Sequence, residues 1–279
     1  MSKWNMIVDV AKCENCHNCF LAVKDEHIGN DFPGYAAPQP LHGHTWIDIK
    51  RVERGQAPIV DAHAMPVMCN HCDDAPCIRA STGGAMYQRP DGIVMIDPQK
   101  AKGQKQLVRS CPYGAIYWND ELDLPQKWIF DAHLLDTGWT KTRAEQVCGT
   151  GALRSLKVED AEMQQIAARE KLEVLLPKAG TKPRVYYRNL HLMEKAFVGG
   201  TVVTSRTGVE ECVAGAQVAL AKNGVSVGQA TTDAFGEFRI DGLDPGSGEY
   251  ELTVSDGGAA VARRTISLGE SLYAGVFEL

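Results

Sequence analysis

The placement of nine cysteines limits most strongly how this chain can fold. Two short runs carry three cysteines each, C-x2-C-x2-C from Cys13 to Cys19 and C-x2-C-x4-C from Cys69 to Cys77. Two more cysteines stand apart: Cys111, which precedes a proline, and Cys148. Three clustered thiols plus one distant thiol, twice over, indicate two four-thiolate metal sites.

A three-cysteine loop with one distant cysteine is the ligand pattern of a cubane iron-sulfur cluster. Short gaps let successive thiolates reach neighbouring irons, whereas the last iron needs a ligand from another segment, often a cysteine followed by proline. We therefore expect two [4Fe-4S] clusters. The first thiol set is Cys13, Cys16, Cys19 and Cys148, and the second thiol set is Cys69, Cys72, Cys77 and Cys111.

Two structural zinc sites are the alternative, because C-x2-C is also zinc-finger spacing. Zinc ribbons present two C-x2-C pairs, whereas this chain presents triplets with single fourth cysteines, so the pattern favours iron-sulfur clusters. Cys212 has no neighbouring cysteine and is expected to be an ordinary thiol.

Charge and hydropathy argue against a nucleic-acid-binding, a secreted or a membrane-spanning protein. Residues 196–279 hold five Lys and Arg against eleven Asp and Glu, so the whole net charge of -6 lies there. Nucleic-acid binding is not expected, since it needs clustered basic residues. The first nine residues do not resemble a signal peptide, and no apolar stretch is long enough to span a membrane. We expect a cytoplasmic protein, in which clustered cysteines indicate metal rather than disulfides.

Residues 1–195 are expected to form an α+β, ferredoxin-like iron-sulfur domain with insertions. The patterns predict strands over 6–10 and 115–118, a hairpin over 85–97, a helix over 158–176 and an extended segment over 182–188. Residues 31–68 are rich in Pro, Gly and His without clear periodicity, and are expected to be an insertion that packs over the clusters or against a partner.

Residues 196–279 are expected to form a separate all-β sandwich or barrel. Val218 and Leu220 alternate with polar or small residues, and Asn223-Gly224 is typical of a hairpin turn. Similar alternation recurs around Ile240, Leu252 and Ile266. This domain holds no ligand cluster or catalytic set, so binding or structural support is expected.

The chain resembles the iron-sulfur β subunits of the molybdopterin oxidoreductase (dimethyl sulfoxide reductase) family. Within that family, it is most similar to the small subunits of pyrogallol-phloroglucinol transhydroxylase and resorcinol hydroxylase. The segments that carry this are DVAKC at 9–13, GIVMIDP at 92–98, CPYG at 111–114 and GTKPRVYY at 180–187. GAQV at 215–218 and TDAFGEF at 232–238 resemble transthyretin-like modules.

The resemblance implies a heterodimer in which this chain transfers electrons and holds no catalytic residue. A large partner would carry a molybdenum or tungsten pterin and act on phenolic substrates in anaerobic aromatic metabolism. A soluble electron acceptor is a further candidate partner. The alternatives are a respiratory β subunit, passing electrons between an inorganic or sulfur substrate and quinone, and a stand-alone ferredoxin.

The family plan also implies ligand positions that this chain has lost. β subunits of this family carry four cysteine groups holding four clusters. Here the ligand positions of two whole clusters hold other residues: Val23, Trp128, Asp131 and Ala144 for one, and Ser81, Ala101, Gln104 and Leu107 for the other. We expect Val23 and Trp128 to fill the space of one missing cluster.

Several polar residues near the cysteines could be further ligands. His71 lies within the second run, and we expect it to support that site rather than to bind metal. His42 and His44 are two apart, and contact with a partner or solvent is the favoured interpretation. Asp25, Glu26 and His27 have the composition of an acid-base set, but a helix cap or partner contact is favoured.

Overall fold

The computed structural model describes residues 1–205 and 208–279. Contacts divide the chain into two compact units. The cysteine unit comprises Met1–Arg51 and His63–Leu190, and the C-terminal unit comprises Val52–Ala62 and His191–Leu279. Residues 52–62 therefore belong to the C-terminal unit, although they lie early in the sequence. The expected boundary between independent domains at residue 195 stays a prediction.

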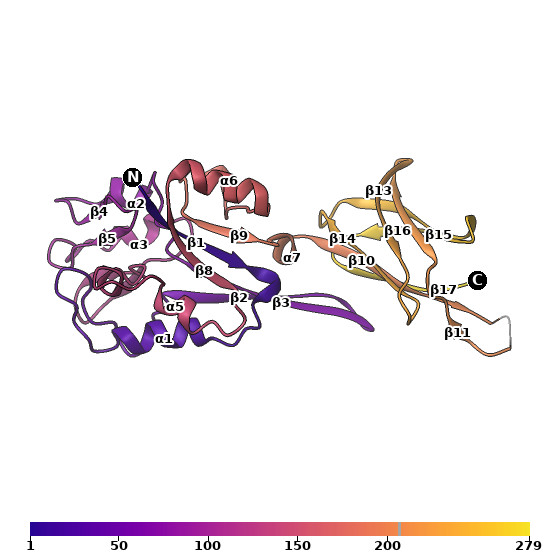
Figure 1. Cartoon of the computed structure of the whole chain (residues 1–279), viewed down its shortest axis with the longest axis horizontal. Coiled ribbons are helices and arrows are strands. Elements are labelled where there is room, and N and C mark those ends of the chain that lie inside the picture. The colour runs from indigo at the N-terminus through magenta and orange to yellow at the C-terminus, as the bar shows by residue number, and fades with distance from the viewer. Residues whose placement is uncertain (206–207) are drawn as a thin grey trace. The chain divides into compact units, whose positions relative to one another are not determined.

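The cysteine unit is built around a three-stranded sheet in the order β8-β1-β9 (Figure 1). β1 (Lys3–Asp9) pairs antiparallel with β8 (Leu153–Val158) and parallel with β9 (Val185–Arg188). Helix α6 (Asp160–Glu170) covers one face of this sheet, where Met163 and Ile166 pack on Ile7. Central β1 is buried on both faces, from Trp4 to Asp9.

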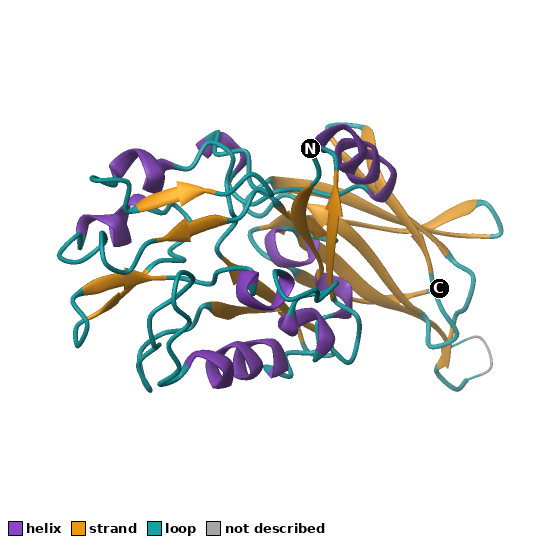
Figure 2. Cartoon of the chain, turned by 60° about the vertical axis from the view of Figure 1, so that its left-hand side comes forward, coloured by secondary structure: helices purple, strands orange, loops and turns teal. Residues whose placement is uncertain are grey.

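Short hairpins and helices make up the rest of the cysteine unit (Figure 2). This mixture confirms the α+β class. The two short hairpins are β4 (Met86–Gln88) with β5 (Val94–Ile96), and β6 (Tyr117–Asn119) with β7 (Leu124–Gln126). The helices are α1 (Asn18–His27), α2 (Pro76–Ala80), α3 (Gln106–Ser110), α4 (Ala132–Leu135) and α5 (Arg143–Gln146), with 3-10 turns at Val10–Lys12 and Pro177–Ala179.

One hairpin was not predicted, and the predicted end of one helix was wrong. Within residues 31–68, whose sequence has no clear periodicity, β2 (Ile47–Gln56) and β3 (Ile59–Met68) form a long hairpin. Charged residues on its half-exposed strands hide the alternation. The helix predicted over 158–176 ends at Glu170, because Lys171 adopts a left-handed conformation with φ of 52°. Glu173 then pairs with Tyr187 instead of continuing the helix.

The C-terminal unit contains two four-stranded sheets that share one apolar core. One sheet has the order β11-β10-β14, with β17 also paired to β10, and the other has the order β13-β12-β15-β16. Its elements are α7 (His191–Glu194), β10 (Ala196–Thr204), β11 (Glu211–Cys212), β12 (Gln217–Lys222), β13 (Val225–Thr231), β14 (Glu237–Leu243), β15 (Gly248–Asp256), β16 (Ala259–Leu268) and β17 (Leu272–Glu278).

The alternation expected in this segment is confirmed by the shared core. Val218, Leu220, Ile240 and Leu252 point into it from both sheets. The Asn223-Gly224 turn joins β12 to β13 as predicted, with both residues at positive φ. In the part of the chain that the structure describes, no helix has the length and apolarity needed to cross a bilayer.

Candidate iron-sulfur sites

The four thiols of the first thiol set line one pocket in the cysteine unit. Cys13 follows the 3-10 turn that ends β1, and its N–H donates to the Val10 carbonyl at 3.2 Å. Asn15 and His17 have positive φ, which curls the chain tightly before α1 begins. Cys148 comes from the turn after α5, which packs against α1. The fold thus brings a thiol 129 residues beyond Cys19 beside the first run.

Burial and mutual repulsion shape the chemistry of these thiols. Burial raises the pKa of Cys13, and the nearby Cys148 thiol raises it further. Burial likewise raises the pKa of Cys19 to about 12, with added repulsion from Cys13 and Cys148. Cys13 and Cys19 would stay protonated without a positive centre beside them. Bound metal supplies that centre, since coordination deprotonates a thiol.

The second thiol set lies around a separate apolar cluster. Cys69 follows β3, and Cys77 lies in the first turn of α2 after a helix-starting proline. Cys111 caps the C-terminal end of α3. Cys72 and Cys77 are buried in the cluster, and Cys111 packs against it.

Burial also dominates the pKa shifts in the second set. Burial raises the pKa values of Cys72 and Cys77 to about 12, and repulsion from Cys69 adds to both. Burial also raises the pKa of Cys111, again with a contribution from Cys69. Thr181 donates a hydrogen bond to the Cys72 sulfur, which favours the thiolate.

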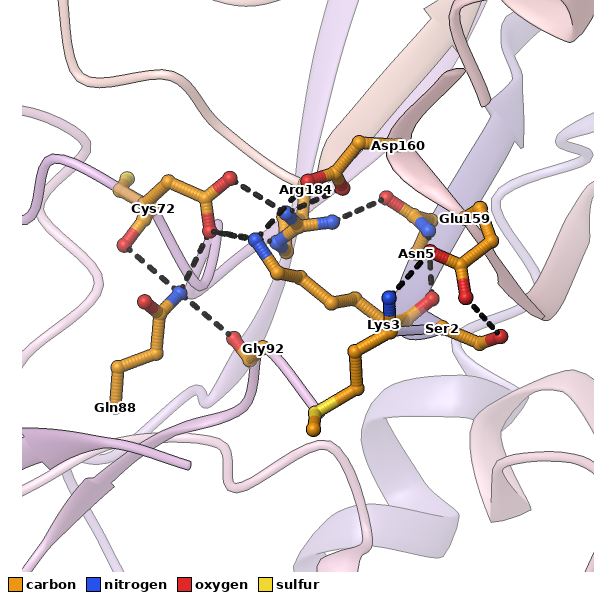
Figure 3. A network of polar contacts seen from close by, with 11 residues as sticks. Ser2, Lys3, Asn5, Cys72, Gln88, Gly92, Glu159, Asp160 and Arg184 are labelled. Atoms are coloured by element: carbon orange, nitrogen blue, oxygen red, sulfur yellow. Dashed lines mark hydrogen bonds and ion pairs between the residues drawn. The ribbon is translucent and has the colours of Figure 1, made fainter. Parts of the chain in front are cut away.

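A polar network holds the loop of the second set in place (Figure 3). The Arg184 N–H donates to the Asn70 carbonyl at 2.8 Å, and the Asp73 N–H donates to the Lys182 carbonyl at 2.9 Å. The Arg184 guanidinium donates to both carboxylate oxygens of Asp73 and to Asp160. Gln88 also donates to Asp73, at 2.8 Å. The segment from 181 to 184, which carries part of the resemblance, thus supports the cysteine loop.

The donors of both sets fit clusters better than single ions. Each set offers four thiols and no oxygen or nitrogen ligand, which suits iron-sulfur chemistry. Over residues 1–205 and 208–279, no three Cys, His, Asp or Glu side chains converge closely enough to hold one metal ion. A cubane spreads its ligands over four irons.

The other polar candidates lie outside the two thiol sets. The exposed Cys212 lies in the C-terminal unit, on β11. His71 is buried, and its Nδ1 accepts from the Val94 N–H at 3.0 Å. His44 contacts the Trp118 carbonyl through Nε2 at 2.9 Å, whereas His42 is exposed. Glu26 pairs with His133 and Arg143.

The ligand positions that the family plan would fill are occupied by packed side chains. Trp128 is fully buried, and its Nε1 donates to Asp131 at 3.0 Å. The other Asp131 oxygen accepts from the Arg143 N–H at 2.8 Å. At the second lost site, Ala101 and Leu107 belong to the apolar cluster beside Cys72 and Cys77. Val23 and Trp128, which we expect to fill the space of one missing cluster, are both buried, at 1% and 0% exposure.

Lys127 is a buried residue of this region that no sequence pattern singles out. Lys127 is only 2% exposed, and its ammonium donates to the Val94 and Trp128 carbonyls. A lysine between a short strand and a tryptophan is ordinary in sequence, so only the fold reveals that it is buried beside the second set.

Comparison with known proteins agrees with this geometry. The family described as "4Fe-4S dicluster domain" matches residues 60–158, which include the second set and Cys148. Such a domain implies two [4Fe-4S] clusters. The family described as "Carboxypeptidase regulatory-like domain" matches residues 198–275.

Individual relatives extend the match to the full length. The chain is 42% identical over 282 residues to the pyrogallol hydroxytransferase small subunit of Pelobacter acidigallici, covering 100% of both chains. It is 30% identical to a tetrathionate reductase subunit of Salmonella typhimurium, covering 70% of this chain and 75% of that one. The beta subunit of dimethylsulfide dehydrogenase from Rhodovulum sulfidophilum is 30% identical over 53% of this chain and 46% of its own length.

Proposed function

The chain belongs to the iron-sulfur small subunits of the molybdopterin oxidoreductase family, and we propose that its large catalytic partner hydroxylates or transhydroxylates phenolic substrates anaerobically. The electron-transfer role follows from membership, and a small subunit implies a large partner. The proposed substrate class rests on the 42% identity, over the full length, to a pyrogallol hydroxytransferase small subunit.

Within this proposal, one cluster is held by Cys13, Cys16, Cys19 and Cys148, and the other by Cys69, Cys72, Cys77 and Cys111. The shared pocket of the first set, and the apolar cluster that Cys72, Cys77 and Cys111 share, support this division. The clusters supply one-electron redox chemistry when bound. The chain's own residues fix the positions of the thiols and bury Cys19, Cys69, Cys72 and Cys77.

Several finer features belong to the same proposal. The cysteine unit is ferredoxin-like and the C-terminal unit is transthyretin-like, with a domain boundary at residue 195. The partner alone carries the molybdenum or tungsten pterin. A soluble electron acceptor is a further partner, nucleic acid is not, and the complex works in the cytoplasm. The C-terminal unit serves binding or support, in keeping with its lack of a thiol set.

A respiratory β subunit is the second candidate, because the chain is also 30% identical to a tetrathionate reductase subunit. That match covers 70% of this chain. The match to the pyrogallol hydroxytransferase small subunit covers 100%, including the whole C-terminal unit. The longer match favours the phenolic substrate class.

Purification of the native complex tests the proposal. We expect a tight heterodimer with a pterin-containing large subunit and about eight irons per small subunit. Activity is expected with polyhydroxylated phenols. A complex that turns over only tetrathionate or sulfoxides would support the respiratory alternative, and a monomer would support a stand-alone ferredoxin.

Single cysteine variants test the ligand assignment. Cys148→Ala should abolish or convert one cluster, and Cys111→Ala should affect the other, as seen by iron content and electron paramagnetic resonance. Cys212→Ala is the matched control and should leave both clusters intact. About twelve irons per chain, or loss of one and the same cluster in both variants, would contradict the assignment.

A further inference from the structure

Lys127 places an ammonium group deep inside the cysteine unit. It is 2% exposed, and its Nζ donates to the Val94 carbonyl at 2.5 Å and to the Trp128 carbonyl at 3.1 Å. Across the described residues, no Asp or Glu forms an ion pair with it. Arg184 is buried to a similar degree, but it pairs with two carboxylates. An unpaired buried charge is costly, and a negative charge near Lys127 would offset that cost.

The second thiol set is the available source of that charge. Val94, which accepts from the ammonium, packs in the same apolar cluster as Cys72 and Cys77. The ammonium lies close enough to Cys77 and Cys111 to lower their pKa values, against the larger effect of burial, which raises them. Lys127 therefore lies beside this set, through its contact with Val94.

The first thiol set has a different electrostatic setting. Burial is the largest influence on the pKa of Cys13, and the charged groups that act on it are Cys148, Cys16 and Glu14, all of which bear negative charge when ionised. Burial is also the largest influence on the pKa of Cys19, and the charged groups that act on it are the other three thiols of its set. The buried ammonium thus distinguishes the second set from the first.

We propose that Lys127 is the internal counter-ion of the cluster held by Cys69, Cys72, Cys77 and Cys111, and that its charge raises this cluster's reduction potential. A cubane with four thiolates is net negative and gains another negative charge on reduction. A fixed cation nearby favours the reduced form, because net charge and burial are among the factors that set cluster potentials. Burial also protects this interaction from screening by salt. Lys127 would act on the cluster's reduction potential without binding the cluster itself. This role rests on the proposed two-cluster function.

The test is a potentiometric titration of the native complex, followed by electron paramagnetic resonance, with the two cluster signals assigned beforehand by the Cys148→Ala and Cys111→Ala variants. In Lys127→Met, the one-electron equilibrium of the second cluster should shift at least tenfold toward the oxidised form, a fall of about 59 mV or more. The first cluster should not shift. Iron content is measured for each variant.

Lys24→Met is the matched control. Lys24 is also buried, at 8% exposure, and its ammonium also donates to two backbone carbonyls, those of Pro40 and His44. We expect Lys24→Met to leave the potential of the second cluster unchanged. An equal shift in both variants would mean that loss of any buried lysine disturbs the site, and would overturn the proposal.

Further variants separate charge from packing. If Lys127→Met fails to assemble the second cluster, Lys127→Arg should restore both its assembly and its potential, because it keeps the charge. Failure of Lys127→Arg as well would show a steric role and overturn the proposal. A Lys127→Met complex with both clusters and less than a twofold shift would also overturn it. Absence of clusters from the wild-type complex would instead contradict the two-cluster function itself.

Discussion

Arg184→Met should destabilise the cysteine unit more than any surface substitution. The Arg184 side chain is 3% exposed and bridges segments far apart in sequence. Its guanidinium contacts Asp73 through two hydrogen bonds, Asp160 at 2.8 Å and Asn5 at 3.2 Å. Methionine keeps much of the apolar stem but removes every one of these donors.

The contacts differ in how much stability they provide. Asp73 is 28% exposed and receives a bidentate pair, whereas Asp160 is 53% exposed and is largely screened by solvent. Hydrogen bonds to charged groups contribute about 1.5–3 kcal/mol each. Lys3, which also contacts Asp73 at 3.5 Å, compensates in part. We expect a loss of about 3 kcal/mol, most of it from the Asp73 pair.

Anaerobic thermal unfolding of the cluster-loaded complex measures this loss. For a unit of this size, about 3 kcal/mol corresponds to a fall in Tm of about 6–12 °C. The absorbance of the second cluster should bleach in the same transition, because Asp73 lies next to Cys72. Arg169→Met is the control, since Arg169 is 70% exposed and pairs only with Glu170. If both variants lowered Tm by the same small amount, the buried network would not support the loop as argued.

Three further predictions concern other parts of the chain. Burial lowers the pKa of His27 to about 3 in the folded chain, against about 6.5 in the unfolded chain. Between these values only the unfolded chain protonates this imidazole, so the free energy of unfolding should fall by about 2 kcal/mol from pH 7 to pH 5. His27→Phe should flatten this decline in Tm, and parallel wild-type and variant curves would contradict it. Gly236→Ala should lower the free energy of unfolding, measured in urea, by at least about 2 kcal/mol more than Gly246→Ala. Both glycines have positive φ, but of the two only Gly236 would place a Cβ against a backbone carbonyl, that of Val202. Equal losses in the two variants would refute the clash. Arg54→Met should lower the stability of the C-terminal unit by about 3–5 kcal/mol, since the buried guanidinium pairs with Asp61 and Asp241, and a change below about 1 kcal/mol would refute this.

Local pattern was enough to predict much of the fold. The apolar run in β1, the alternation in β12 and the Asn223-Gly224 turn each depend on neighbouring residues. The β2–β3 hairpin was missed because charged residues occupy its exposed positions and interrupt the apolar alternation. The end of α6 was missed because it depends on pairing between Glu173 and Tyr187, which only the folded chain brings together.

For the candidate sites as well, features set by neighbouring residues could be predicted, whereas contacts between residues far apart in sequence could not. Cysteine spacing alone grouped the eight thiols, because ligand geometry restricts how many residues can separate neighbouring thiolates. The supporting contacts could not be predicted. Arg184 and Asp73 are 111 residues apart, and Lys127 lies 33 residues from the Val94 carbonyl that it contacts. No periodic pattern links such positions, since tertiary packing alone decides them.

The lost ligand positions and the buried lysine are connected. Trp128, which directly follows Lys127, occupies a position where the family plan would place a ligand of another cluster. Its side chain packs against His71 and Phe130, with ring centroids 5.8 Å and 4.9 Å away. A cluster at that position would have offered Lys127 a second negative neighbour. With a tryptophan there instead, the proposed charge interaction of Lys127 is concentrated on the second thiol set. Exchange of Trp128 for another apolar residue should therefore alter stability while leaving that cluster's potential nearly unchanged, in contrast to exchange of Lys127.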